Sequence, residues 1–184
     1  HNHTGETCDK CPTVPPQENG VYQISTEQQL RGYARIVNTE NRTASAVLKA
    51  DITVSGEWTP IGGSDVYFQG TFDGQNYSIT FKQPVTSTSK YVGLFAKTGS
   101  SAEIKNLTVQ GDFECNGTHV GGIVGLNKGT ITNCKLQNST VTNTGSNTAA
   151  RTGGLVGENY GTIQNSQVVD STVTGVGGYT GGLV

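Results

Sequence analysis

The sequence has few of the residues from which helical cores and charged binding surfaces are made. Among its 184 residues there is no methionine and one tryptophan, 33% are hydrophobic and only 14% are charged. Helices must bury wide apolar stripes against one another, so this composition argues against a thick helical core. The formal net charge of −2 leaves no basic excess to neutralise phosphates, which argues against a nucleic-acid partner. No apolar run approaches the ~20 residues of a membrane helix, so we expect no membrane insertion.

Glycine, threonine, asparagine and serine supply much of what is present, and glycine alone accounts for 26 residues. Thin strands rich in threonine, joined by glycine and asparagine turns, fit this composition. The N-terminus has neither the charged nor the apolar region of a signal peptide. The sequence stops at Gly181-Gly182-Leu183-Val184, an element that earlier copies continue with glycine. We therefore expect a segment of a longer protein that is truncated at its C-terminus.

Three segments are expected along the chain. Residues 1–20 hold three of the five prolines and a Cys-x-x-Cys element but no apolar periodicity, as in a tail or linker. Residues 21–46 are expected to form a capping strand and one helix, which Ser25 caps and which ends near Asn38. The apolar face expected for this helix consists of Leu30, Tyr33, Ala34 and Val37. Residues 47–184 show short alternating strands separated by turn residues.

Internal repetition in the third segment predicts the architecture. HVGGIVGLNKGTITNCKLQNSTVT (119–142) aligns without a gap with RTGGLVGENYGTIQNSQVVDSTVT (151–174), and a divergent earlier copy spans 91–111. Each copy holds three strand-sized runs, which is too few for a propeller blade, and no amphipathic helix. The sequence therefore predicts an all-β protein, a right-handed parallel β-helix (solenoid) with a short N-terminal capping α-helix.

Successive coils of a β-helix lie about 4.8 Å apart, so equivalent residues of neighbouring copies should stack into ladders. The expected ladders are an interior column of Ile104, Ile131 and Ile163 and a turn column of Asn106, Asn133 and Asn165. We expect the turn amides to hydrogen-bond from coil to coil and to satisfy groups that the turn leaves buried. Ile79 is expected to begin the isoleucine series, with Phe81 in place of the asparagine.

The repeats GGIVGLNKGTITNC and GGLVGENYGTIQNS resemble the GLUG motif of large bacterial surface proteins and of IgA1-specific metallopeptidases. The upstream stretch ISTEQQLRGYARIVN, followed by WTPIG and GTFDG, is similar to the segment that opens many such bacterial β-helices. The resemblance implies a helix that caps the coil stack and an extracellular or bacterial cell-surface location. It also implies a stalk or adhesive role, outside the catalytic domain in the peptidases.

The side chains that could carry catalysis are scattered along the sequence. Acid–base catalysis needs two groups within several ångströms of each other, and no Asp or Glu recurs at a matching repeat position. His119 aligns with Arg151, and Glu158 is placed opposite Asn127. The metallopeptidase motif HExxH is absent from the sequence. We therefore expect no catalytic site and no enzyme activity.

Two cysteine groups have different expected roles. Cys134 aligns with an apolar position and is expected to point into the coil as a small buried thiol, and a disulfide to Cys115 is not favoured. In the tail, two imidazoles and two thiolates have the composition of a tetrahedral zinc site. The residues of this candidate zinc site are His1, His3, Cys8 and Cys11. Three states stay open for the tail cysteines, namely zinc ligands, a small disulfide or unpaired thiols, and no other cofactor is expected.

The leading functional hypothesis is a non-catalytic adhesion or spacer module that contacts a host or cell-surface glycan or protein. The alternatives are an accessory region of a large exported peptidase and a carbohydrate-active β-helix. A minor alternative is recognition of an ordered surface such as ice, through stacked threonines at 140–142 and 172–174. The sequence leaves the ligand and the oligomeric state open.

Overall fold

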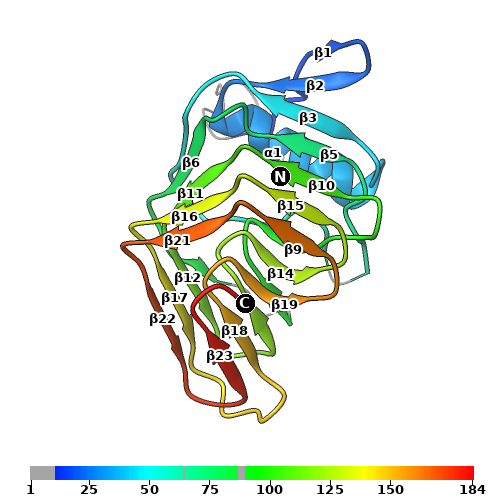
Figure 1. Ribbon diagram of the computed structural model, residues 1–184. Coiled ribbons are helices and arrows are strands. Elements are labelled where there is room, and N and C mark those ends of the chain that lie inside the picture. Colours follow the sequence, from blue (N-terminus) through cyan, green and yellow to red (C-terminus); the bar gives the residue numbers. More distant parts are fainter. Residues whose placement is uncertain (1–10, 64, 87–89) are drawn as a thin grey trace, which may run out of the picture.

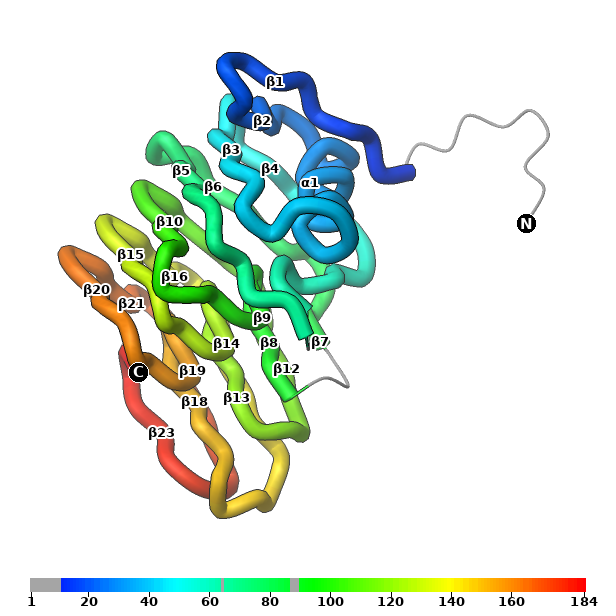
Figure 2. The backbone as a smooth tube through the Cα atoms, turned by 90° about the vertical axis from the view of Figure 1, so that its right-hand side faces the viewer, coloured from blue at the N-terminus to red at the C-terminus, as the bar shows by residue number. Residues whose placement is uncertain are grey.

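The computed structural model describes residues 11–63, 65–86 and 90–184, and these residues form the expected parallel β-helix (Figure 1). In this part of the chain the strands of successive coils stack into five sheets. Figure 2 shows the helix at one end of the stack and the last coil at the other.

We name each of the five sheets after the strand that residues 119–143 contribute to it. The β15 sheet contains β1 (Gln17–Glu18), β2 (Val21–Ile24), β3 (Ser45–Leu48), β5 (Thr71–Asp73), β10 (Glu103–Lys105), β15 (Thr130–Thr132) and β20 (Thr162–Gln164). The β16 sheet contains β4 (Ile52–Val54), β6 (Ser78–Phe81), β11 (Thr108–Gln110), β16 (Lys135–Gln137) and β21 (Gln167–Val169). The β17 sheet contains β7 (Val85–Thr86), β12 (Asp112–Cys115), β17 (Thr140–Asn143) and β22 (Thr172–Gly175).

Two further sheets complete each coil. The β13 sheet contains β8 (Tyr91–Val92), β13 (His119–Val120), β18 (Arg151–Gly153) and β23 (Tyr179–Gly181). The β14 sheet contains β9 (Phe95–Lys97), β14 (Val124–Asn127) and β19 (Val156–Asn159). Because one coil passes through all five sheets, residues from different sheets of neighbouring coils can meet at a bend.

The isoleucine column lies inside the coils. Ile104 pairs in register with Ile131, and Ile131 pairs with Ile163. Ile104 and Ile131 are fully buried, and Ile163 is partly buried against the same core. The parallel pairing follows the spacings of 27 and 32 residues between these isoleucines.

The assignment of Ile79 to this column is wrong. Ile104 pairs with Phe72 of the preceding coil, whereas Ile79 pairs with Val109 in the β16 sheet. Phe72 fills the interior position as completely as an isoleucine would, since it is fully buried. The aromatic substitution conceals the match in the sequence, and Phe81 is therefore not the counterpart of the turn asparagines.

The turn asparagines share a left-handed backbone conformation, with φ values of 52° at Asn106, 53° at Asn133 and 48° at Asn165. The Asn133 Nδ2 group donates to Oδ1 of Asn106 at 3.1 Å. In the same way, Nδ2 of Asn106 donates to Oδ1 of Asp73 at 3.1 Å. Asn133 and Asn165 are exposed to solvent, so the positive φ, which asparagine tolerates well, explains these residues better than the satisfaction of buried groups.

Helix α1 (Glu27–Thr39) covers the N-terminal end of the coil stack, and its buried face contains the four expected apolar residues. Its N-cap is Thr26 rather than Ser25, because the Thr26 hydroxyl accepts a hydrogen bond from the Gln29 backbone N–H. The Gln29 side chain in turn accepts from the Ser25 N–H at 2.7 Å. Within the described residues, no helix is both long and apolar enough to span a bilayer.

The end of the expected tail packs against this cap instead of extending as a linker. Strand β1 pairs with β2 in an antiparallel hairpin, whose turn contains Asn19 and Gly20 with φ values of 51° and 80°. Both values are positive, as a type I′ hairpin turn requires. Further upstream, the Thr13 N–H donates to the Gln28 carbonyl of the helix at 2.9 Å. The Asn-Gly pair was the sequence signal for this hairpin.

Candidate functional site

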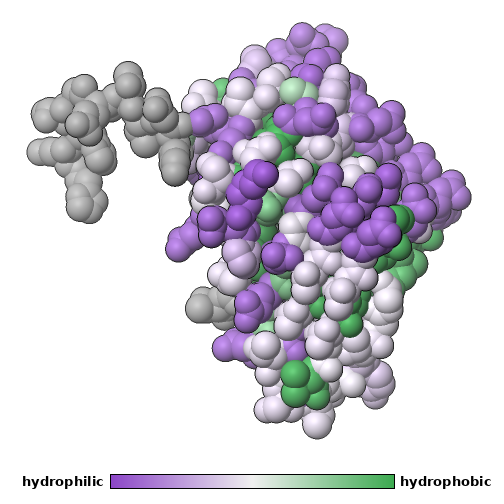
Figure 3. Space-filling model, turned by 90° about the vertical axis from the view of Figure 1, so that its left-hand side faces the viewer, coloured by the Kyte–Doolittle hydropathy of each residue, from purple (hydrophilic) through white to green (hydrophobic). Residues whose placement is uncertain are grey.

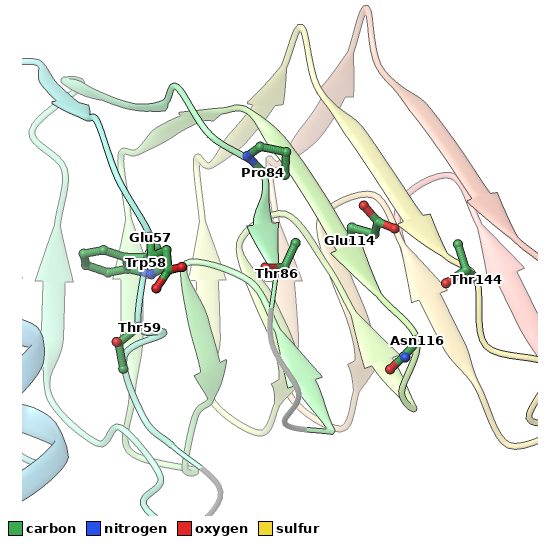
Figure 4. A pocket seen from close by; sticks show the side chains of 8 residues that line it. All are labelled: Glu57, Trp58, Thr59, Pro84, Thr86, Glu114, Asn116 and Thr144. Carbon is green, nitrogen blue, oxygen red and sulfur yellow. The ribbon is translucent and has the colours of Figure 1, made fainter.

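A groove along the β17 sheet brings two carboxylates to one cavity. Its volume is about 560 Å³, and it is lined by Glu57, Trp58, Thr59, Pro84, Thr86, Glu114, Asn116 and Thr144. Figure 4 shows Glu57 and Glu114 on opposite sides of Thr86, so the two carboxylates do not converge on one point.

Trp58 contributes little surface to this groove, although it lines the cavity. Its side chain is 5% exposed, its Nε1–H donates to the Leu94 carbonyl at 3.2 Å, and its ring packs 5.7 Å from the ring of Phe81. The indole therefore belongs to the hydrophobic core and offers no broad stacking platform for a ligand.

A second candidate site lies where the β13 sheet turns into the β14 sheet. The turn contains glycine pairs in successive coils, and a Cβ atom at Gly121 or Gly153 would collide with the backbone carbonyl of Val124 or Val156. Only glycine allows the chain to bend back this closely. The strands on the two sides of the bend run in different directions (Figure 1). We call this bend, with the outer side chains around it, the corner.

One outer column of the corner follows the first position of the β13 sheet. Its residues, paired in register from coil to coil, are Tyr91, His119, Arg151 and Tyr179. The next residue of the strand points inward, since Val92 and Val120 are fully buried. The outer column of the β14 sheet consists of Lys97, Leu126 and Glu158. The corner thus presents aromatic, cationic and acidic side chains from four coils.

His119 and Glu158 connect the two columns. The Nε2 atom of His119 lies 2.8 Å from Oε2 of Glu158, and its Nδ1 atom lies 2.8 Å from the Thr118 hydroxyl. The imidazole stacks on the ring of Tyr91 with centroids 4.9 Å apart. Burial lowers the pKa of His119 below its usual value, and the nearby Arg151 lowers it further, although Glu158 opposes both. At neutral pH the neutral imidazole therefore donates from Nε2 to Glu158.

The cations of the corner lie against aromatic rings. The guanidinium carbon of Arg151 is 4.5 Å from the ring centroid of Tyr179. The ammonium nitrogen of Lys97, whose residue is only 4% exposed, is 4.2 Å from the ring centroid of Tyr67. Lys128 approaches the same ring at 5.0 Å. Such cation–π contacts hold charged groups in fixed positions while they remain charged.

The arrangement can hold ligands more readily than it can catalyse. Nε2 of His119 is engaged by Glu158, and Nδ1 lies beside the Thr118 hydroxyl, whose single hydrogen is shared between Nδ1 and the Lys90 carbonyl oxygen 3.0 Å away. The two thiols outside the tail are buried and free, and burial raises the pKa of Cys134 to about 12. A thiol that stays protonated is a poor nucleophile.

The sequence alignment misplaced Glu158. At the 32-residue offset, Glu158 pairs with Leu126, while Asn127 pairs with Asn159. Asn127 is fully buried, where its Oδ1 accepts from the Thr98 hydroxyl at 2.6 Å. Its Nδ2 group donates to Oδ1 of Asn159 at 2.7 Å. The structure therefore contains an interior polar ladder that the sequence reasoning did not identify, although the asparagines of GLNKG and GENYG mark it.

The candidate zinc residues lie almost entirely outside the described part of the chain. His1, His3 and Cys8 belong to the residues that the structure does not describe. Cys11 is disulfide-bonded, which is one of the three states considered for the tail cysteines. Among the described residues, no group of three or more His, Cys, Asp or Glu side chains could hold a metal ion. Because zinc binds thiolates and not a disulfide, zinc binding through Cys11 requires the reduced tail, and it stays a prediction.

The outer threonines form a short array on the β17 sheet. Thr140 pairs with Thr172, and Thr142 pairs with Thr174. In the preceding coil the same two positions hold Asp112 and Glu114, which end the array. On the face in Figure 3, hydrophilic and near-neutral residues dominate, and hydrophobic atoms form small separate groups. The array is therefore small for recognition of an extended ordered surface.

Comparisons with known proteins support the fold. A family model described as the GLUG motif matches residues 116–144. Among solved structures, the chain is similar to a proposed immunoglobulin A1 protease from Bacteroides ovatus, with a TM-score of 0.64 and 21% sequence identity. The match covers 88% of this chain and 60% of that one, so this chain spans less than two thirds of the other's length. No curated protein sequence matches this chain.

Proposed function

We propose that this chain is a non-catalytic module of an exported bacterial protein, acting in adhesion or as a spacer at the cell surface. The main observation in favour is that, among the described residues, the one histidine and the two free thiols are engaged or buried. The nitrogens of His119 lie beside Glu158 and the Thr118 hydroxyl, and the thiols of Cys115 and Cys134 are buried. The remaining candidates, the carboxylates of Glu57 and Glu114 in the β17 groove, do not converge on one point. This arrangement of the described residues suits binding or spacing better than turnover.

The architecture supports a role in adhesion or spacing. Each coil contacts mainly its neighbours, so added coils lengthen the module without changing its cross-section. Outer side chains recur in register from coil to coil, as Tyr91, His119 and Arg151 do. Such a rod separates two ends by a fixed distance and presents the same outer positions along its length.

An accessory role in a large exported peptidase is the second candidate. It is favoured by the GLUG match together with the description of the Bacteroides ovatus structure as a proposed immunoglobulin A1 protease. In that case the β-helix positions or extends a catalytic domain elsewhere in the parent protein. The sequence of a longer parent protein would distinguish the accessory role from the adhesive role. An HExxH motif in it would favour the peptidase, and a wall anchor would favour adhesion.

The test measures binding and turnover on the same purified chain. Binding is measured on an array of glycans and host-matrix proteins, and turnover on pectic and uronic-acid polysaccharides and on immunoglobulin A, with and without Ca²⁺ and Zn²⁺. We expect binding without turnover. Turnover that disappears in Glu57→Gln or Glu114→Gln, which remove the carboxylates of the β17 groove, would instead establish a carbohydrate-active β-helix.

A further inference from the structure

We infer that the corner binds an acidic glycan, with Arg151 contacting a carboxylate of the sugar chain and the exposed tyrosines beside it contacting the sugar rings. This inference rests on the proposed function in adhesion and names the site and the ligand class. It follows from three independent observations at the corner, which concern its charge, its exposed aromatic rings and its shape.

The charge of the corner is opposite to that of the whole chain. The accessible cations beside its aromatic rings are Lys128 and Arg151, and the carboxylate of Glu158 lies between the two columns. His119 stays neutral at pH 7, because burial lowers its pKa. The chain as a whole has a formal net charge of −2. A local excess of cations on a weakly acidic protein attracts an anionic ligand to that place and not to the rest of the surface.

Exposed aromatic side chains are also concentrated at the corner. All thirteen aromatic residues lie in the described part of the chain, and only Tyr160 and Tyr179 are largely exposed, at 68% each. Tyr160 donates its hydroxyl to Oε1 of Glu158 at 3.0 Å, and Tyr179 lies against Arg151. Tyrosine combines an apolar ring with a polar tip, and tyrosine and arginine are enriched at binding surfaces.

The shape of the corner follows the coil stack. Where the two sheets meet, a Cβ atom at Gly157 would lie 2.7 Å from the Gly125 carbonyl oxygen. The glycine therefore brings the two sheets close together. Four coils of the outer column, at about 4.8 Å per interval, extend over ~14 Å along the stack.

Arg151 is the side chain best placed to contact a carboxylate. Its Nη1 donates to the Ala150 carbonyl at 3.2 Å, and its Nε lies 3.8 Å from Glu158, beyond hydrogen-bonding distance. Its Nη2 group has no hydrogen-bond partner among the described residues. The contact with Tyr179 holds the guanidinium in place, so little conformational freedom is lost when it pairs with a carboxylate.

The inference is tested by calorimetric titration of the 184-residue chain with two acidic probes and their neutral counterparts. The probes are a hexamer of galacturonic acid, compared with its methyl ester, and sialyllactose, compared with lactose, so that ring-borne carboxylates from two sources are distinguished. We expect at least one acidic probe to bind about tenfold or more tightly than its neutral counterpart, with an affinity that falls as salt increases. Equal affinity for acidic and neutral forms would overturn the inference.

Variants locate the site. Arg151→Gln should weaken binding of the acidic probe by about 10- to 100-fold, since one charge-assisted bond is lost. Tyr160→Ser should weaken binding of both acidic and neutral forms, because it removes an exposed ring. The matched control is Arg35→Gln, which changes the same residue type on α1, where Arg35 pairs with Glu40 at the surface. Circular dichroism of each variant checks that the fold is retained.

The outcomes separate the inference from the proposed function. Array binding that is unchanged in Arg151→Gln, or that is lost in Glu114→Gln instead, would overturn the site while the proposed adhesive role stands. Binding to neutral glycans or to protein alone would overturn the ligand class in the same way. A chain that binds nothing on the array and nothing in the titrations would overturn both.

Discussion

Replacement of Asn127 by alanine tests the interior polar ladder. Its side chain makes four hydrogen bonds, in which Nδ2 donates to Asn159 and to the Gly129 carbonyl, while Oδ1 accepts from Thr98 and from the Gly129 N–H. Two of the partners keep other bonds, since the Gly129 carbonyl also accepts from the Thr162 N–H and Oδ1 of Asn159 also accepts from the Gly161 N–H. The substitution therefore leaves the Thr98 hydroxyl hydrogen and the Gly129 N–H without acceptors.

The expected loss of stability follows from these two groups. Thr98 is fully buried and Gly129 is buried, and each unsatisfied buried group costs about 1–3 kcal/mol. Asn127→Ala should therefore lower the free energy of unfolding by about 2–6 kcal/mol. The control is Asn133→Gly, which removes an exposed amide with one side-chain bond and suits the φ of 53° at that position. It should cost about 0.5–1 kcal/mol.

Urea unfolding provides the measurement. Fluorescence of Trp58, the one tryptophan of the chain, reports on the core, and circular dichroism reports on the strands. Coincident transitions from the two probes are needed before free energies are extrapolated, because long repeat arrays can unfold in parts. A loss below about 1 kcal/mol for Asn127→Ala, or a loss equal to that of Asn133→Gly, would refute the stabilising role of the ladder.

Further stability measurements address the isoleucine column, the glycine bend and the buried imidazole. Ile131→Ala should cost about 2–5 kcal/mol in the same urea experiment, since Ile131 is fully buried, and a cost below about 0.5 kcal/mol would contradict that position. Gly153→Ala should destabilise the fold, because its Cβ would meet the Val156 backbone, whereas Gly56→Ala, with its nearest contact at 3.6 Å, should have little effect. The lowered pKa of His119 means that the unfolded chain binds the proton more readily, so stability is fully present above pH 6.5 and should fall as the pH drops below it. Thermal unfolding between pH 7 and 5 should show this fall, and His119→Gln should reduce it.

The coil period and the stacked columns could be predicted from the sequence because stacking makes equivalent positions neighbours. Ile104, Ile131 and Ile163 share one column for this reason. The prediction failed at the first coil, where Phe72 occupies the isoleucine position and the following turn is longer. A buried column requires apolar volume and not a particular residue, so repeat identity fades where the core changes shape.

The cap was predicted in type but not in detail. The amphipathic spacing of Leu30, Ala34 and Val37 located α1, whereas its N-cap lies one residue later than expected, at Thr26. Ser25 and Thr26 are both good capping residues, and the local sequence does not decide between them. The residue at which the helix begins is set by tertiary contacts, because the buried face of the helix must pack against the end of the coil stack.

The corner was hidden from the sequence for a different reason. An alignment of repeats compares residues within one column, and in that comparison His119 faces Arg151 and Glu158 faces Leu126. The contact that joins the two columns runs from His119 of one coil to Glu158 of the next, across a bend between two sheets. This contact forms only because the chain bends sharply between the two sheets. The glycines at the bend permit that angle, but their presence in the sequence does not show which side chains the bend brings together. In a stacked fold, contacts between columns are therefore the least visible in the sequence, and they are also the contacts that gather different chemical groups at one place.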